Sequence, residues 1–222
     1  MTALLIDTAT ERGVIALFSE GKLCTAQELA VGLTNSQNLL PSINALFSQV
    51  GMEPSHLSYV GVSHGPGSYT GIRVGVATAK ALSLALAIPL VGFGSLRGYV
   101  PPKECSGPFF AAIDAKIGGV YLLKGRWKEE SVEFVDEEEL VPFESFIDRI
   151  HEVECIVTPN RLPLATRLEA KGVNNYPEII EKAPSATALM HEADKRFKNN
   201  FYSFDGSLPL LYLRKTQAEL NE

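Results

Sequence analysis

The sequence predicts an α/β fold made of two related halves, residues 1–100 and 101–222, with a cleft between them. Short apolar segments of strand-forming residues alternate with segments whose apolar residues recur at helical spacing. A glycine-rich bend at residues 65–71 joins an apolar strand to a long helix. Duplication is indicated because an apolar strand, a terminal aspartate, a tight turn and a Gly-Val strand occur at residues 4–17 and again at 110–123.

The first half is expected to follow the order βββαβαβ. Strand-forming segments around a turn at residues 20–21 predict an opening meander. Thr34, Asn35 and Ser36 are candidate N-caps of the first helix. Apolar residues at helical spacing indicate that this helix extends to Val50. The expected strands are residues 3–6, 13–19, 22–28, 57–63 and 89–93, and the second helix covers residues 71–87.

The second half is expected to repeat this opening and then continue with strands and helices. Its first two strands are residues 110–114 and 119–123. Residues 209–214 predict a final strand or a docking segment, and a tail follows. The remaining expected elements are strands 132–135 and 155–158 and helices 143–150, 164–171 and 185–198.

Composition narrows the classes of function. The chain has 222 residues, 45% of them hydrophobic, and a net charge of −6. This charge argues against the chain holding a nucleic-acid backbone by itself, so a partner should carry the basic surface. Cys24, Cys105 and Cys155 are far apart and form no C-x-x-C pair, which fits a reducing compartment. The longest apolar region, residues 74–91, is broken by a lysine and a proline, so a cytoplasmic protein without membrane attachment is expected.

The glycine bend matches none of three familiar loops. Its glycines follow the spacing G-x-G-x-x-x-G, which differs from the dinucleotide-binding pattern. No Gly-Lys-Ser/Thr follows, which excludes a Walker loop. The residues two before and two after Ser68 are Pro66 and Thr70, and a nucleophile elbow has glycines at both positions, so this motif is excluded. The bend therefore predicts a helix start with a cluster of free amide donors.

Every fourth residue of the helix after the bend has a small side chain or none. Residues four apart form a ridge on a helix, and a ridge without bulk permits close approach of a neighbour. Glycine inside a helix costs roughly 0.5–1 kcal/mol relative to alanine, so Gly75 implies a compensating contact. From the residues alone, the neighbour is either the sheet of the same domain or another subunit. The ridge consists of Gly71, Gly75, Ala79, Ser83 and Ala87.

Two aspartates are candidates for phosphate or Mg²⁺ chemistry. Asp7 and Asp114 each end a strand before a tight turn, and the hydroxyls of Thr8 and Thr10 would assist them. The alternative is that Asp7 caps local backbone amides and Asp114 starts a turn, and spacing alone favours this alternative.

Metal chemistry has little support in the sequence. The four histidines, His56, His64, His151 and His191, never fall at H-x-x-x-H or H-E-x-x-H spacing. The acidic residues between 129 and 139 lack ligand spacing and predict a solvated surface.

Five segments carry distinctive motifs: Leu5-Ile6-Asp7-Thr8-Ala9-Thr10, Leu39-Leu40-Pro41, Gly65-Pro66-Gly67-Ser68-Tyr69-Thr70-Gly71-Ile72-Arg73, Ala111-Ala112-Ile113-Asp114-Ala115 and Tyr212-Leu213-Arg214. Together they closely resemble the TsaB (YeaZ) family, across almost the whole chain. The resemblance implies a duplicated ribonuclease-H-like fold of the actin and sugar-kinase superfamily. It also implies a non-catalytic role in bacterial tRNA threonylcarbamoyladenosine synthesis, which modifies the adenosine next to the anticodon in tRNAs reading codons that begin with A.

The resemblance also implies partners. They are a TsaD-like catalytic paralogue, a TsaE-like ATPase and a second copy of the chain, with tRNA bound only through the complex. Members of this family associate through the helices that correspond to residues 35–50 and 71–87, as a four-helix bundle. The implied interface residues are Leu39, Ile43, Leu46, Gly71, Ile72, Gly75, Val76 and Ala79.

Departures from the superfamily's motifs agree with a non-catalytic role. Ser95 and Tyr99 stand where TsaD-like relatives carry a metal-binding H-x-x-x-H pair. Ala9 replaces the glycine of the first phosphate motif, and its Cβ should crowd a phosphate. The resemblance implies no cofactor, although weak nucleotide binding stays open at a vestigial cleft formed by Asp7, Thr8, Thr10, Asp114 and Gly118. Two alternatives are an active ATPase or phosphotransferase and, from an older label of the wider family, a glycoprotease-like metallopeptidase.

Overall fold

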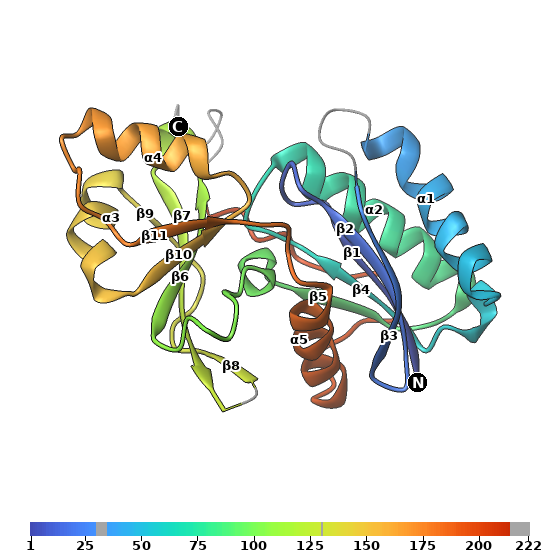
Figure 1. The fold of residues 1–222 in the computed structure, drawn as a ribbon. Coiled ribbons are helices and arrows are strands. Elements are labelled where there is room, and N and C mark those ends of the chain that lie inside the picture. The colour runs from blue at the N-terminus through green and yellow to red at the C-terminus, as the bar shows by residue number, and fades with distance from the viewer. Residues whose placement is uncertain (30–34, 130, 214–222) are drawn as a thin grey trace. The chain divides into compact units, whose positions relative to one another are not determined.

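The computed structural model describes residues 1–29, 35–129 and 131–213, which form two compact units (Figure 1). Among the described residues, unit 1 contains Met1–Gly98 and Ala183–Leu211, and unit 2 contains Tyr99–Lys182 and residues 212–213. The predicted division at residue 100 differs from this arrangement, because it left residues 183–211 in the second half. The candidate caps Thr34, Asn35 and Ser36 lie outside the residues whose side chains are described.

Unit 1 is built on a five-stranded sheet in the order β3-β2-β1-β4-β5. The first three strands form an antiparallel meander, and β1, β4 and β5 run parallel. The order βββαβαβ predicted for the first half is confirmed. The elements are β1 (Thr2–Asp7), β2 (Val14–Ser19), β3 (Lys22–Glu28), α1 (Asn35–Val50), β4 (Tyr59–Ser63), α2 (Tyr69–Leu86), β5 (Leu90–Phe93) and α5 (Ala186–Lys198).

Helices cover both faces of this sheet, with α1 and α2 on one side and α5 on the other (Figure 1). Successive side chains of a strand point to opposite faces. Leu4 and Ile6 of β1 accordingly pack with α1 and α2, whereas Leu5 packs with Leu189 and Met190 of α5. A strand buried on both faces is apolar at every position, which is why β1 shows no polar alternation.

Unit 2 repeats the same topology. Its main sheet has the order β11-β10-β6-β7-β8, with β9 paired to β7. The meander β6-β7-β8 is antiparallel, and β6, β10 and β11 are parallel, as in the corresponding strands of unit 1. The elements are β6 (Pro108–Asp114), β7 (Val120–Lys128), β8 (Ser131–Phe134), β9 (Glu139–Val141), α3 (Phe143–Arg149), β10 (Cys155–Thr158), α4 (Arg161–Ala170) and β11 (Glu178–Glu181).

Two segments differ from their predictions, and a third takes one of its two predicted forms. Strands β9 and β11 were not expected, because each is short and begins with a glutamate that weakens a strand signal. Of the two alternatives predicted for residues 209–214, no strand forms over residues 209–213, and the segment instead docks on unit 1, where the Leu211 amide donates to the carbonyl of His64 at 2.8 Å. Arg214 lies outside the described residues.

Within the parts of the chain that are described, every helix is too short or too polar to cross a lipid bilayer.

Candidate functional site

The glycine bend packs directly on the residues that follow β1. A Cβ added at Gly67 would lie 2.1 Å from the carbonyl oxygen of Ala9, and one at Gly71 would lie 2.1 Å from that of Thr8. The Ser68 amide donates to the Ala9 carbonyl at 2.7 Å, and the Gly71 amide donates to the Ser68 hydroxyl, the N-cap of α2, at 3.2 Å. The prediction of free amide donors is therefore wrong at Ser68 and Gly71, because the chain itself accepts from both.

The small ridge of α2 faces the sheet of its own unit. A Cβ at Gly75 would lie 2.3 Å from the hydroxyl oxygen of Thr8, and that hydroxyl donates to the Gly71 carbonyl at 2.8 Å. Ala79 and Ser83 are fully buried. Of the two neighbours that the sequence left open, the structure places the domain's own sheet against the ridge from Gly71 to Ser83, whereas Ala87 is the exposed C-cap of α2.

The implied interface residues consequently need a correction. Gly75 is buried in α2 and Gly71 is half-buried against Thr8. The other six belong to one apolar core between the two helices and the sheet, so their side chains are not available to a partner. These six are Leu39, Ile43, Leu46, Ile72, Val76 and Ala79.

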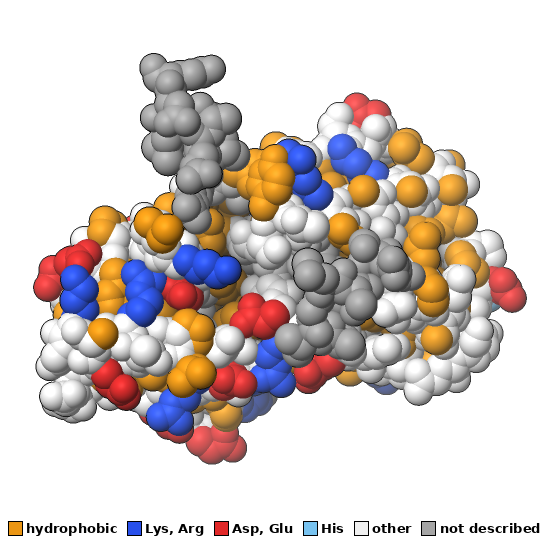
Figure 2. Space-filling view, turned by 90° about the horizontal axis from the view of Figure 1, so that it is seen from above, with side chains coloured by type: hydrophobic (Ala, Val, Ile, Leu, Met, Phe, Trp, Pro, Cys, Tyr) orange, Lys and Arg blue, Asp and Glu red, His pale blue; other side chains and the backbone are white. Residues whose placement is uncertain are grey.

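The opposite sides of the same helices are accessible. Leu40 of α1 is 52% exposed and Leu84 of α2 is 55% exposed. Tyr69 is exposed near the start of α2, with the Arg73 guanidinium 3.9 Å from its ring centroid. Figure 2 shows hydrophobic side chains scattered over the part of the surface that carries α1 and α2. We call the exposed set Leu40, Ala45, Tyr69, Ala77, Ala81, Leu84 and Ala85 the outer face of α1 and α2.

Asp7 lies below the glycine bend and is 1% exposed. Its Oδ1 accepts hydrogen bonds from the Ala9 amide at 2.9 Å and from the Ser63 hydroxyl at 2.5 Å. Its Oδ2 is buried without a hydrogen-bond partner among the described residues. Burial raises the pKa of Asp7 to about 6, against the lowering effect of these two hydrogen bonds. Asp7 therefore caps a local backbone amide, which is the alternative to phosphate chemistry that the sequence favoured.

Thr8 and Thr10 are buried beside it. The Thr8 hydroxyl is engaged with Gly71, and the Thr10 hydroxyl accepts from the Arg12 amide at 3.2 Å. In unit 1 the structure therefore brings together three of the five residues predicted for a nucleotide cleft, and it covers them with the chain's own backbone.

Asp114 belongs to unit 2 and has partners there. Its Oδ1 accepts from the Lys116 amide at 3.1 Å and forms an ion pair with the guanidinium of Arg167. Arg167 also donates to the Gly119 carbonyl at 3.2 Å and lies 3.9 Å from the ring centroid of Phe143. The sequence did not indicate Arg167, because one arginine in the last turn of α4 has no distinctive spacing.

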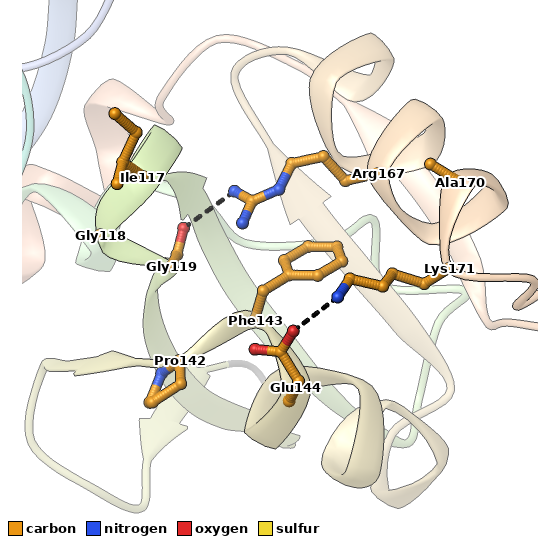
Figure 3. A pocket seen from close by; sticks show the side chains of 9 residues that line it. All are labelled: Ile117, Gly118, Gly119, Pro142, Phe143, Glu144, Arg167, Ala170 and Lys171. Atoms are coloured by element: carbon orange, nitrogen blue, oxygen red, sulfur yellow. Dashed lines mark hydrogen bonds and ion pairs between the residues drawn. The ribbon is translucent and has the colours of Figure 1, made fainter.

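A pocket of about 560 Å³ opens beside Arg167 in unit 2. Figure 3 shows Arg167 and Lys171 reaching toward Phe143 and Glu144, and the Lys171 ammonium contacts the Glu144 carboxylate at 2.7 Å. Each cation is thus already paired with a carboxylate, which reduces its attraction for a phosphate. The lining residues are Ile117, Gly118, Gly119, Pro142, Phe143, Glu144, Arg167, Ala170 and Lys171.

The turn that lines this pocket is closed on itself. The Gly118 amide donates to the Ala115 carbonyl at 3.1 Å, and the Gly119 amide donates to that of Lys116 at 3.2 Å. Gly119 adopts a φ of 107°, which favours glycine. Both amides of the glycine pair are therefore used within the turn that follows Asp114.

The remaining positions with predicted chemical meaning are structural. Ser95 is buried and its hydroxyl donates to the Pro66 carbonyl, and Tyr99 is buried. His64 Nδ1 lies 2.8 Å from the Pro209 carbonyl, and burial lowers the pKa of His64. Across residues 1–29, 35–129 and 131–213, no three His, Cys, Asp or Glu side chains are grouped to hold a metal ion.

Comparisons with known proteins agree with this fold. A protein-family model described as "TsaD: tRNA N6-adenosine threonylcarbamoyltransferase" matches residues 33–158. The solved structure "YeaZ from Pseudomonas aeruginosa" superposes with a TM-score of 0.75 at 20% identity, covering 95% of this chain and 99% of that one. The predicted class, α/β with a duplicated ribonuclease-H-like fold, is confirmed.

Two relatives carry the name "tRNA threonylcarbamoyladenosine biosynthesis protein TsaB". The Escherichia coli protein is 31% identical over 150 residues, which are 64% of this chain and 64% of the relative. The Bacillus subtilis protein is 31% identical over 153 residues, 68% of this chain and 67% of the relative. The matched region thus spans about two thirds of each relative's length. With a family model covering more than half of its residues and relatives of this similarity, the chain belongs to the TsaB family, within the wider group that the TsaD model describes.

Proposed function

We propose that the chain is a non-catalytic scaffold and activator subunit for threonylcarbamoylation of the adenosine next to the anticodon, in tRNAs reading codons that begin with A. It acts by binding a TsaD-like transferase, and a TsaE-like ATPase joins the pair in the cytoplasm. Membership of the TsaB family, whose relatives are named as biosynthesis proteins of this modified nucleoside, supports the proposal.

One observation carries the non-catalytic part of the proposal. Where the superfamily's first phosphate motif would lie, Thr8 and Ala9 are in contact with the chain's own Gly67 and Gly71. A phosphate approaching this motif would meet these contacts, which supports a role without phosphate chemistry. Ser95 and Tyr99, at the positions of the metal-binding histidines of TsaD-like relatives, are neither imidazole nor carboxylate and lie in the protein interior.

The docking surface that we propose for the TsaD-like partner, and for a second copy of the chain, is the outer face of α1 and α2. Leucine side chains more than half exposed on both helices, Leu40 and Leu84, are apolar area that a partner would remove from water. Small residues between them, Ala77 and Ala81, let a partner helix approach closely. The helices are those implied by the family resemblance, but the contacting residues are different ones.

Reconstitution tests the proposal. The chain is mixed with its TsaD-like and TsaE-like partners, tRNA, ATP and threonylcarbamoyl-adenylate, and modified adenosine is measured by mass spectrometry of digested tRNA. Modification is expected to collapse when the chain is omitted. Unchanged modification without the chain, or modification by the chain alone, would rule the proposal out.

The second candidate is an ATPase or phosphotransferase. The observation in its favour is the volume of the pocket beside Arg167 and Lys171, and the pairing of both cations with carboxylates counts against it. Titration calorimetry with Mg-ATP on the isolated chain separates the two functions. Micromolar binding with turnover of ATP would favour the enzyme, whereas the scaffold predicts no turnover.

A further inference from the structure

We propose that Cys105 and Cys155 of unit 2 are a redox-active thiol pair, which closes to an intramolecular disulfide when it reacts with a small-molecule disulfide such as oxidised glutathione. The two residues are 50 positions apart in the sequence, yet their sulfur atoms lie 2.7 Å from each other. Both are free thiols. Spacing along the chain had suggested three isolated cysteines, and the fold brings two of them into contact.

The approach of the two sulfurs follows from how the Cys105 loop is attached to the sheet. Cys155 is the first residue of β10 and pairs with Phe109 of β6. Immediately before it, the Glu154 amide donates to the Pro108 carbonyl at 2.8 Å. The Glu154 carboxylate in turn accepts from the Gly107 amide at 3.0 Å. These two bonds hold the residues that follow Cys105 beside the residue that precedes Cys155.

Gly107 lies directly against the Glu154 carboxylate. A Cβ at this position would lie 2.0 Å from the carboxyl carbon of Glu154, so the exposed Glu154 side chain would have to shift to admit a larger residue. On the other side of Cys105, its own amide donates to the Pro102 carbonyl at 3.1 Å and closes a turn. The sulfur of Cys105 is therefore positioned by ordered backbone on both sides.

Exposure assigns different roles to the two thiols. Cys105 is half-buried and can be reached by a small disulfide, whereas Cys155 is 1% exposed. Burial raises the pKa of Cys155, as does its contact with Cys105, and the charges of Glu178 and Glu154 act in the same direction. Because the thiolate is the reactive form, Cys105 is the attacking thiol and Cys155 the resolving thiol.

The reaction balances as two thiol–disulfide exchanges. The Cys105 thiolate attacks one sulfur of oxidised glutathione, whose S–S bond breaks and releases one glutathione thiolate. Cys155 then loses its proton to this thiolate or to water and attacks the Cys105 sulfur, which releases the second glutathione. Two protein thiols are oxidised to one disulfide, and one glutathione disulfide is reduced to two thiols.

The cross-link would tie the start of unit 2 to its central sheet. The loop it closes contains β6 to β9 and α3, so the disulfide restricts the unfolded chain over a large part of the unit. A higher unfolding temperature of unit 2 in oxidising buffer is therefore expected.

The test uses the full-length chain in glutathione buffers of graded ratio, followed by alkylation of free thiols, intact mass measurement and peptide mapping. The expected product has lost two hydrogen atoms, contains a peptide linking Cys105 to Cys155, and melts several degrees higher than the reduced chain. Cys24 is exposed on β3 of unit 1, so Cys24→Ser is the matched control and should keep the cross-link.

Cys105→Ser should lose both the cross-link and the rise in melting temperature, and it is chosen because a serine at half-buried Cys105 disturbs packing less than one at Cys155. The proposal is overturned by three results: glutathione that stays attached to Cys105 without closure, cross-linked dimers through Cys24 as the sole oxidised product, or the same rise in melting temperature in Cys105→Ser.

Discussion

Gly75 lies where α2 packs against the end of β1 and the residue that follows it. The absent Cβ would lie 2.3 Å from the Thr8 hydroxyl oxygen and 3.6 Å from a methyl carbon of Ile6. Thr8 cannot turn away freely, because its hydroxyl donates to the Gly71 carbonyl. The glycine is thus required by packing within one domain.

Gly75→Leu is therefore expected to lower the free energy of unfolding by about 1–3 kcal/mol, since overpacking outweighs the gain in helix propensity. Ala77→Leu, at an exposed position on the same helix, is the control and should change stability little. Urea denaturation followed by circular dichroism measures both. A variant with unaltered stability that fails to bind its partner would mean that the ridge is an interface after all.

Asp7 is the second residue whose environment sets a measurable property. Burial raises its pKa from 3.8 to about 6. Between these values the folded chain holds the proton more tightly than the unfolded chain does, so the contribution of Asp7 to stability falls as pH rises through this window. Above pH 6 the full cost of the buried charge is present.

Asp7→Asn removes this titration. The free energy of unfolding of the variant minus that of the native chain is expected to increase by about 1–3 kcal/mol as the pH rises from 4 to 8. Comparing the difference at the two pH values cancels any constant effect of the amide group. Chemical denaturation at several pH values measures it, and a difference that does not vary with pH would contradict the assignment.

At the scale of elements, each helix of unit 1 has one face buried in the core and one face exposed to solvent. The inner face of α1 and α2 holds Leu39, Ile43 and Ile72, all nearly inaccessible to solvent. A change on the outer face should therefore alter binding without altering the fold.

Leu84→Arg is expected to leave the unfolding free energy within about 0.5 kcal/mol of the native value. It should reduce co-purification with the TsaD-like subunit at least tenfold, because a buried charge without a partner opposes association. Leu162→Arg is the matched control, since Leu162 is a leucine 72% exposed on α4 of unit 2. Equal retention of the partner by both variants would remove the outer face of α2 from the interface.

At the scale of the molecule, α5 decides where the first unit ends. Leu189, Met190 and Ala193 of α5 cover one face of the first sheet, and the Ser185 amide donates to the Gly98 carbonyl at 2.7 Å. The chain thus leaves unit 1 at Gly98, forms unit 2, and returns to the point of departure.

A fragment of residues 1–98 is expected to aggregate or remain unfolded, because it exposes the apolar face that α5 covers. Joining residue 98 to residue 183 through a short Gly-Ser linker, with residues 99–182 deleted, should restore a folded monomer. Circular dichroism and size-exclusion chromatography compare the two fragments. Cooperative unfolding of the fragment 1–98 would show that α5 is dispensable.

Local sequence patterns were enough to determine the order of strands and helices in the first half and the duplication. Apolar periodicity and turn residues act over a few positions, so they report secondary structure directly. The motifs of the glycine bend and of the two aspartate-ended strands were enough to indicate the TsaB family. Strands as short as β9 and β11 gave too few residues for a pattern.

The tertiary structure alone decided which groups meet. A ridge of small residues has the same appearance whether it faces a sheet or another subunit, and only the position of Thr8 against Gly75 distinguishes the two. The pairing of Asp114 with Arg167 and the contact of Cys105 with Cys155 join residues about fifty positions apart. Such contacts depend on how elements pack in three dimensions, and a pattern read along one dimension does not contain that information.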